Sequence, residues 1–114
     1  MNWYLLSGVT TLILLLLASG VSAHPPSDLN LTYNQTSGNL SATFTHQVAD
    51  PTTHYIKNVK IWLNDAETLN DDYDSQPNTD VFTYEYPLNV TGGTKIDVSG
   101  ECSIFGTLKK SLEV

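Results

Sequence analysis

Apolar and polar residues alternate along most of the chain beyond residue 24. The pattern is clearest in residues 39–46, NLSATFTH, where every second side chain is apolar until the row ends in a histidine. A period of two is typical of a β-strand with one buried face. We therefore predict a strand here with these side chains facing the core: Leu40, Ala42, Phe44 and His46.

The same period recurs in residues 28–34, 54–64, 79–88, 94–103 and 106–114, and an acidic stretch predicts a short edge strand around residues 68–73. Turn-forming residues at 35–38 and 91–93 separate neighbouring segments. The pattern predicts an all-β fold, an immunoglobulin-like β-sandwich of about seven strands. The predicted inner rows are Leu29, Leu31 and Tyr33; Tyr55, Val59, Ile61 and Leu63; Phe82, Tyr84 and Tyr86; Ile96, Val98 and Cys102; Leu108, Leu112 and Val114.

Residues 1–23 have a different composition. An apolar run, Leu12–Ala18, is followed by the small-residue pattern Val21-Ser22-Ala23, which indicates a secretory signal peptide cleaved after residue 23. A retained membrane anchor is the alternative, although the apolar stretch is shorter than the ~20 residues of a spanning helix. We expect residues 24–114 to form one small domain that is secreted or held at the cell surface.

The net charge of the chain limits the classes of molecule that it is expected to bind. Twelve acidic residues against five lysines give a net charge of −7, which argues against nucleic acid as a ligand. An exported chain also offers its Asn-X-Ser/Thr sequons to glycosylation. The candidate N-glycan sites are Asn30, Asn34, Asn39 and Asn89.

Cys102 is the only cysteine, so it cannot form a disulfide within the chain. Three roles remain open for it: a small buried hydrophobic residue, an intermolecular link in a homo-oligomer, or a metal ligand. Three histidines accompany it, and imidazoles with a thiolate suit iron, copper or zinc. We predict a metal site made of His24, His46, His54 and Cys102.

The positions of these four residues along the predicted strands would allow their side chains to meet at one end of the sandwich. His46 ends one predicted strand and His54 begins the next, with a proline-containing turn between them. Cys102 continues a core-facing row and precedes Gly106. If these strand ends lie at the same pole of the sandwich, their side chains can meet there.

Three segments resemble a known family. HPP at 24–26, DPTTHYIKNVKIWL at 50–63 and CSIFG at 102–106 are similar to the iron-binding domain of desulfoferrodoxin and neelaredoxin, the superoxide reductases. The resemblance implies an immunoglobulin-like sandwich that holds one non-haem iron through four equatorial histidines and an axial cysteine thiolate. It also implies an oxidoreductase, with a separate protein as electron donor because this chain lacks a rubredoxin-like cysteine cluster.

By this resemblance His24 matches the first histidine of the family, His54 the third and Cys102 the axial thiolate. His46 matches the second loosely, because it lies eight residues before His54 where the family has six. Phe105 stands in place of the fourth histidine, and we expect it to fill that space as core packing. The glutamate and lysine that precede the family's first histidine are replaced by Ser22 and Ala23.

Cleavage after Ala23 would make His24 the first residue, and a terminal amine has a pKa of about 7.7–8.0. We hypothesise that this amine replaces the missing equatorial nitrogen. An amine and imidazole from one residue also suit copper, so copper is the alternative to iron. A different class of function stays open: a non-enzymatic immunoglobulin-like module of the cell surface, with or without bound copper or zinc.

Overall fold

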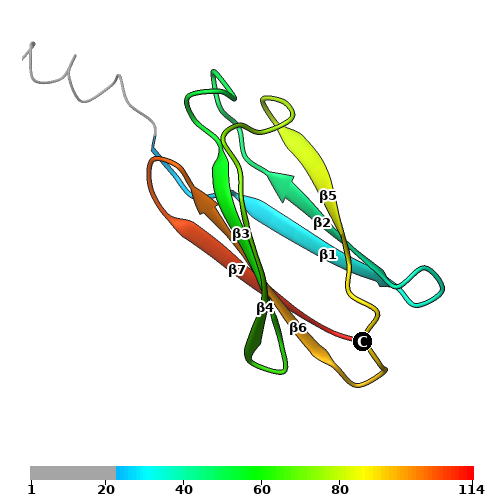
Figure 1. Cartoon of the computed structure of the whole chain (residues 1–114). Helices are drawn as coiled ribbons and strands as arrows, with labels where there is room; N and C mark the ends of the chain where they lie inside the picture. The colour runs from blue at the N-terminus through cyan, green and yellow to red at the C-terminus, as the bar shows by residue number, and fades with distance from the viewer. Residues whose placement is uncertain (1–22) are drawn as a thin grey trace, which may run out of the picture.

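A computed structural model describes residues 23–114, and the predicted signal peptide lies outside these residues except for Ala23. The described residues form seven strands and two layers (Figure 1). The strands are β1 (Asp28–Asn34), β2 (Asn39–Thr45), β3 (Ile56–Leu63), β4 (Ala66–Asp72), β5 (Val81–Pro87), β6 (Lys95–Cys102) and β7 (Thr107–Glu113).

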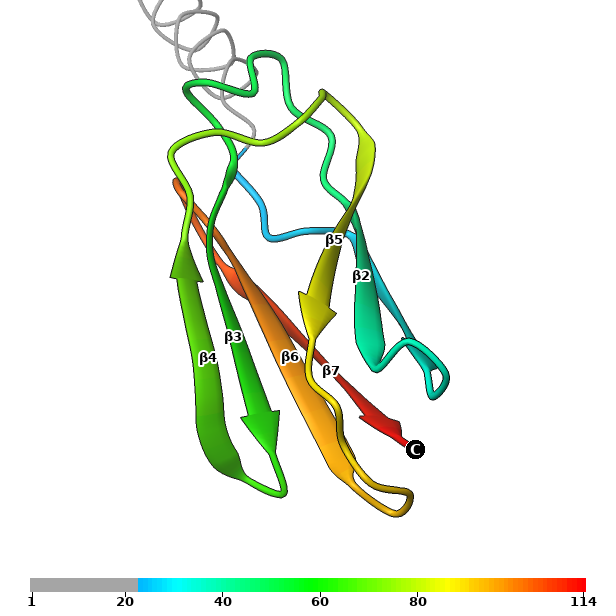
Figure 2. The same cartoon turned by 45° about the vertical axis from the view of Figure 1, so that its right-hand side comes forward.

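One layer is a three-stranded sheet in the order β1-β2-β5, and the other is a four-stranded sheet in the order β4-β3-β6-β7 (Figure 2). All neighbouring strands are antiparallel. The chain changes sheet between β2 and β3, between β4 and β5, and between β5 and β6. Seven strands divided between two sheets confirm the predicted immunoglobulin-like β-sandwich.

The core lies between the sheets and is built from the predicted alternating rows. Leu40, Ala42 and Phe44 of β2 are fully buried, and Phe44 pairs with Phe82 across β2 and β5 with ring centroids 5.7 Å apart. Ile96 and Val98 of β6 are buried against them. Complete burial of each such side chain contributes about 1.5–3 kcal/mol to folding, so these rows fix which face of each strand points inward.

Two local predictions need correction. Tyr55 was expected on the inner face in phase with Val59, but it precedes β3 and the fully buried side chain is Ile56. A β-bulge between Ile56 and Asn58 shifts the register against β6 and changes the phase at the start of the strand. The acidic edge strand covers Ala66–Asp72, so it begins and ends slightly earlier than predicted.

Several loops meet at one end of the sandwich, which we call the histidine pole. They are the N-terminal segment 23–27, the β2–β3 loop 46–55, the β4–β5 loop 73–80 and the β6–β7 turn 103–106. Backbone hydrogen bonds join them: His46 N–H donates to Asp80 O, and Ser103 N–H donates to Tyr55 O. Within residues 23–114 there is no helix of the length and hydropathy that a membrane crossing requires.

Candidate metal centre

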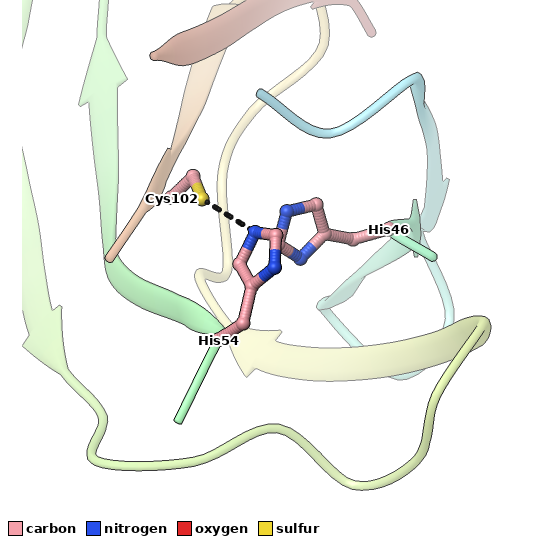
Figure 3. A group of neighbouring side chains, drawn as sticks. All are labelled: His46, His54 and Cys102. Carbon is pink, nitrogen blue, oxygen red and sulfur yellow. Dashed lines mark hydrogen bonds between the residues drawn. The ribbon is translucent and has the colours of Figure 1, made fainter. Parts of the chain in front are cut away.

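The histidine pole brings together two histidines of the β2–β3 loop and the cysteine that ends β6 (Figure 3). His46 directly follows β2 and is fully buried. His54 lies in the loop before β3 and is partly buried. Cys102 is the last residue of β6, where it pairs with Ile56 and is 2% exposed.

The donor atoms of these three residues lie within 4.8 Å of one another. The Nε2 atom of His54 is 3.2 Å from the Sγ atom of Cys102, and the His46 and His54 ring centroids are 4.8 Å apart. Metal–nitrogen bonds of about 2.0–2.1 Å and metal–sulfur bonds of about 2.3 Å allow a nitrogen and a sulfur on opposite sides of one ion to lie at most ~4.4 Å apart. The three donor atoms must therefore move closer together to hold a single ion.

The electrostatics of the centre favour a neutral imidazole at His54. Burial lowers its pKa below the usual value of 6.5, and repulsion from His46 and then from His24 lowers it further. A neutral imidazole has a free lone pair, which is the form that binds a metal. The same shift disfavours an imidazolium–thiolate pair with Cys102, which a cysteine nucleophile of the Cys–His type would need.

The surroundings of Cys102 bear on the three roles left open for it. Its backbone N–H donates to Gly106 O at 2.9 Å, and Ile104 N–H points at its Sγ atom at 3.4 Å. These contacts hold the sulfur toward the histidines. At 2% exposure the sulfur is inaccessible to a second chain, so an intermolecular disulfide is disfavoured in this conformation.

The structure places His24 beside the other three residues but not in the same cluster of donor atoms. Its ring centroid lies 5.2 Å from that of His46 and 5.5 Å from that of His54. Its ring nitrogens lie near backbone oxygens instead, Nδ1 at 2.9 Å from Pro25 O and Nε2 at 3.1 Å from Gln47 O. His24 therefore covers the centre, and its ring must turn before it can act as a ligand.

The N-terminal segment is held against the fold by close packing. Gly106 has a φ of +90°, and a β-carbon at this position would lie 2.9–3.1 Å from the ring atoms of Pro25. Ser27 N–H donates to Thr45 O at 2.8 Å at the start of β1. Together these contacts place His24 over the cluster.

The prediction for Phe105 is wrong. Its side chain is 65% exposed and does not fill a space in the core, and the neighbouring Ile104 is 52% exposed. Both belong to the β6–β7 turn, whose backbone reverses direction at Gly106 immediately after Cys102. No side chain of this turn takes the place of a fourth histidine.

Sequence reasoning missed Gln76, which lies in the β4–β5 loop and is 4% exposed. Its Oε1 atom is 2.8 Å from His46 Nδ1 and accepts from Ile56 N–H at 3.2 Å. Its Nε2 atom donates to His46 O and Asn78 O. Nothing local in the polar loop sequence marks this residue, because its contacts with His46 and Ile56 join positions 30 and 20 residues away in the chain.

No protein-family model matches this sequence, and comparison with curated proteins gives no significant match. The interpretation of the centre therefore depends on its own chemistry.

Proposed function

We propose that residues 24–114 form a metal-binding redox domain of the superoxide-reductase type, with His46, His54 and Cys102 as the protein ligands. The observation that carries the proposal is the approach of two imidazoles and one thiol to within 4.8 Å, from both sheets, at a largely buried site. His46 already contacts Gln76 and His54 already contacts Cys102, so the support for a metal comes from the convergence of these donor types and not from unpaired polar atoms.

The donor set fits a redox-active or thiophilic ion. Imidazole suits iron, copper and zinc, and a thiolate selects copper(I), zinc or thiolate-ligated iron. We propose non-haem iron as the bound metal, with copper as the alternative, because the resemblance to superoxide reductases supports iron. Magnesium and calcium are disfavoured, because they prefer oxygen ligands and the three donors here are nitrogen and sulfur.

A bound Fe(II) would supply one electron to superoxide, which with two protons becomes hydrogen peroxide, and a separate electron-donor protein would return that electron. The chain contributes the surroundings of this reaction. Burial of His46 and Cys102 excludes bulk water from the ligands, and the lowered pKa of His54 keeps its imidazole available near neutral pH. His24 covers the centre from the side of the N-terminal segment.

A second candidate has its own support. Phe105 is exposed and replaces the fourth histidine of the resembling family, and Ala23 replaces the lysine before the first. A domain that keeps the sandwich and three donors but lacks these groups suits a non-enzymatic module of the cell surface, which would bind metal without turnover. Secretion is part of both proposals, because both assign the apolar segment before residue 23 to a signal peptide.

The deciding experiment is the metal content of the exported protein, purified without chelator or affinity histidines, with its N-terminus read by mass spectrometry. One equivalent of iron with a thiolate-to-metal absorption band supports the first proposal, and consumption of superoxide with an added reductant establishes turnover. Metal binding without superoxide consumption supports the second. Protein that contains no metal and takes up neither Fe(II) nor Cu(I) contradicts a metal site.

A further inference from the structure

The Gln76 side chain occupies a central position behind the metal centre, and the direction of its amide can be deduced from its neighbours. Oε1 faces a backbone donor, Ile56 N–H, at 3.2 Å. Nε2 faces two backbone acceptors, His46 O at 3.0 Å and Asn78 O at 2.9 Å. The opposite orientation would place an NH2 group against an N–H and an oxygen against two carbonyls, so these three contacts permit a single assignment.

This orientation decides which nitrogen of His46 carries the proton. Gln76 Oε1 can only accept, and it lies 2.8 Å from His46 Nδ1. On its other side the ring places Nε2 at 3.3 Å from His24 O, which is also an acceptor, so the two carbonyl oxygens compete for the single proton of the neutral ring. The shorter contact, at Nδ1, favours the proton on Nδ1 and leaves the lone pair on Nε2.

We propose that Gln76 is a positioning residue that fixes the Nδ1–H tautomer of His46 and makes Nε2 its metal-binding atom. Histidines that bind metals commonly donate their other ring N–H to a carboxylate or a carbonyl, which sets both tautomer and ring orientation. Here the carbonyl comes from a side-chain amide. The tautomer follows from the hydrogen bonds alone, whereas the metal-binding role of Nε2 rests on the proposed function.

The same amide also sets the spacing of the centre. Gln76 accepts from the backbone two residues after His54 and donates to the backbone of His46 itself. His46 follows a strand of one sheet and Ile56 begins a strand of the other. One buried side chain from the β4–β5 loop therefore holds the two ligand segments together across the sandwich.

The first test uses metal-free wild-type protein and the ring nitrogen chemical shifts of His46 in a long-range ¹⁵N–¹H spectrum. The spectrum is recorded in mildly alkaline buffer. The expected result is the Nδ1–H tautomer. A predominant Nε2–H tautomer in the folded wild-type protein overturns the proposal, and this result depends on neither a variant nor a metal.

The second test compares two substitutions. Gln76→Glu keeps an acceptor for His46 Nδ1–H and should preserve the tautomer, although it loses the donor to His46 O and Asn78 O. Gln76→Met fills similar space without an acceptor and should lose the tautomer. Gln35→Met makes the same change at an exposed position in the β1–β2 turn, at the opposite end of the sandwich. A Gln76→Met protein that is folded by its amide spectrum and keeps the Nδ1–H tautomer contradicts the proposal.

The third test titrates Fe(II) anaerobically into the same proteins. Loss of a hydrogen-bond partner of a ligand typically weakens metal binding by 10–100-fold, so we expect about this loss in Gln76→Met. We expect a smaller loss in Gln76→Glu, which keeps the acceptor for His46 but not the donor to its backbone, and no change in Gln35→Met. Equal affinity of Gln76→Met and wild type overturns the role in metal binding. If wild-type protein binds no metal, the proposed function fails while the tautomer measurements still decide the role of Gln76.

Discussion

The Nε2 atom of His54 lies 3.2 Å from the Sγ atom of Cys102, although 48 residues separate them in the chain. The contact is produced by the pairing of β3 with β6, in which Ile56 stands opposite Cys102. His46 reaches the same point from the other sheet. A metal held by all three would therefore join the two layers of the sandwich, which connects metal binding directly to stability.

We expect Cys102→Ala to abolish the thiolate-to-metal absorption band and to remove the stabilisation that the metal gives. Ligand present at 100 times its dissociation constant raises the free energy of unfolding by about 2.7 kcal/mol. Wild-type protein should show a gain of this order when Fe(II) or Cu(I) is added, and the variant should show little or none. Urea denaturation with and without metal measures both.

Ser103→Ala is a suitable control for this change, because Ser103 follows Cys102 and its hydroxyl accepts from Tyr55 N–H without belonging to the cluster of donor atoms. Ser103→Ala should lower the free energy of unfolding and should leave the stabilisation by added metal unchanged.

Alkylation of wild-type protein is a second test of the Cys102 sulfur, because Cys102 is the only cysteine. Bound metal should slow the alkylation of this sulfur. Undiminished metal stabilisation in Cys102→Ala would remove the thiol from the site.

The lowered pKa of His54 predicts a pH dependence for the metal-free protein. Between that lowered pKa and the unfolded value of about 6.5, the unfolded chain binds more protons than the folded one, so the free energy of unfolding increases with pH. Acidification through this window should therefore destabilise the protein, with no such penalty above it. His54→Asn should flatten the dependence in a series of urea denaturations.

Asp97 contributes to the pH dependence of stability in a more acidic range than His54, so the contributions of the two residues can be separated. The Ser111 hydroxyl, followed by Lys95, lowers the pKa of Asp97, although burial opposes this. Stability contributed by Asp97 is therefore present above about 3.8 and is lost as the pH falls through its lower folded pKa. If His54→Asn lost stability between neutral pH and pH ~5 as steeply as the wild type, His54 would not be the group responsible.

The sequence predicts much of the fold because a period of two reports directly on burial within a sheet. The rows ending in His46 and Cys102 were identified in this way, and both residues are buried at one pole. The β-bulge before Asn58 was not predictable, because one extra residue reverses the phase without changing composition. Gln76 was missed because its partners come from two other segments.

Phe105 shows the limit of an argument from resemblance. The position was expected to be buried because an apolar residue had replaced a ligand, yet the turn geometry after Cys102 directs the side chain to solvent. A resemblance between short segments suggests which residue occupies a position but not where a short turn points its side chain. The exposure of Phe105 therefore had to come from the structure.

Comparing Gly106→Ala with Gly93→Ala should show how much stability comes from packing of the N-terminal segment and how much is lost to backbone strain alone. Gly106 and Gly93 have nearly the same positive φ, +90° and +89°. A β-carbon at Gly106 meets the Pro25 ring, whereas at Gly93 it meets nothing within 4 Å. Both alanine variants should lose about 1–2 kcal/mol from backbone strain, and Gly106→Ala should lose roughly 1 kcal/mol more from the clash.

Chemical denaturation of the two variants gives this difference, and the ring resonances of His24 report the displacement of the segment. They should shift in Gly106→Ala and stay unchanged in Gly93→Ala. Equal losses of stability in the two proteins, with His24 unaffected, would show that the Pro25–Gly106 contact does not position the histidine.

Phe105→His tests whether the β6–β7 turn can supply a further ligand. Because the phenylalanine is 65% exposed, its replacement should change stability by no more than about 0.5 kcal/mol. The new imidazole lies three residues after Cys102, so a modest movement of the turn would add a nitrogen donor to the cluster. We expect tighter binding of Fe(II), measured by anaerobic titration, and faster consumption of superoxide than in the wild type.

Ile104→His is the matched control, since it places an imidazole on the adjacent exposed position of the same turn. Ile104 contributes its backbone N–H to the Cys102 sulfur, and that contact does not depend on its side chain. A gain confined to Phe105→His would assign the fourth-ligand position to residue 105. Equal gains in both variants would instead show a general effect of an added histidine, and no gain in either would mean that the turn cannot bring a side chain to the metal.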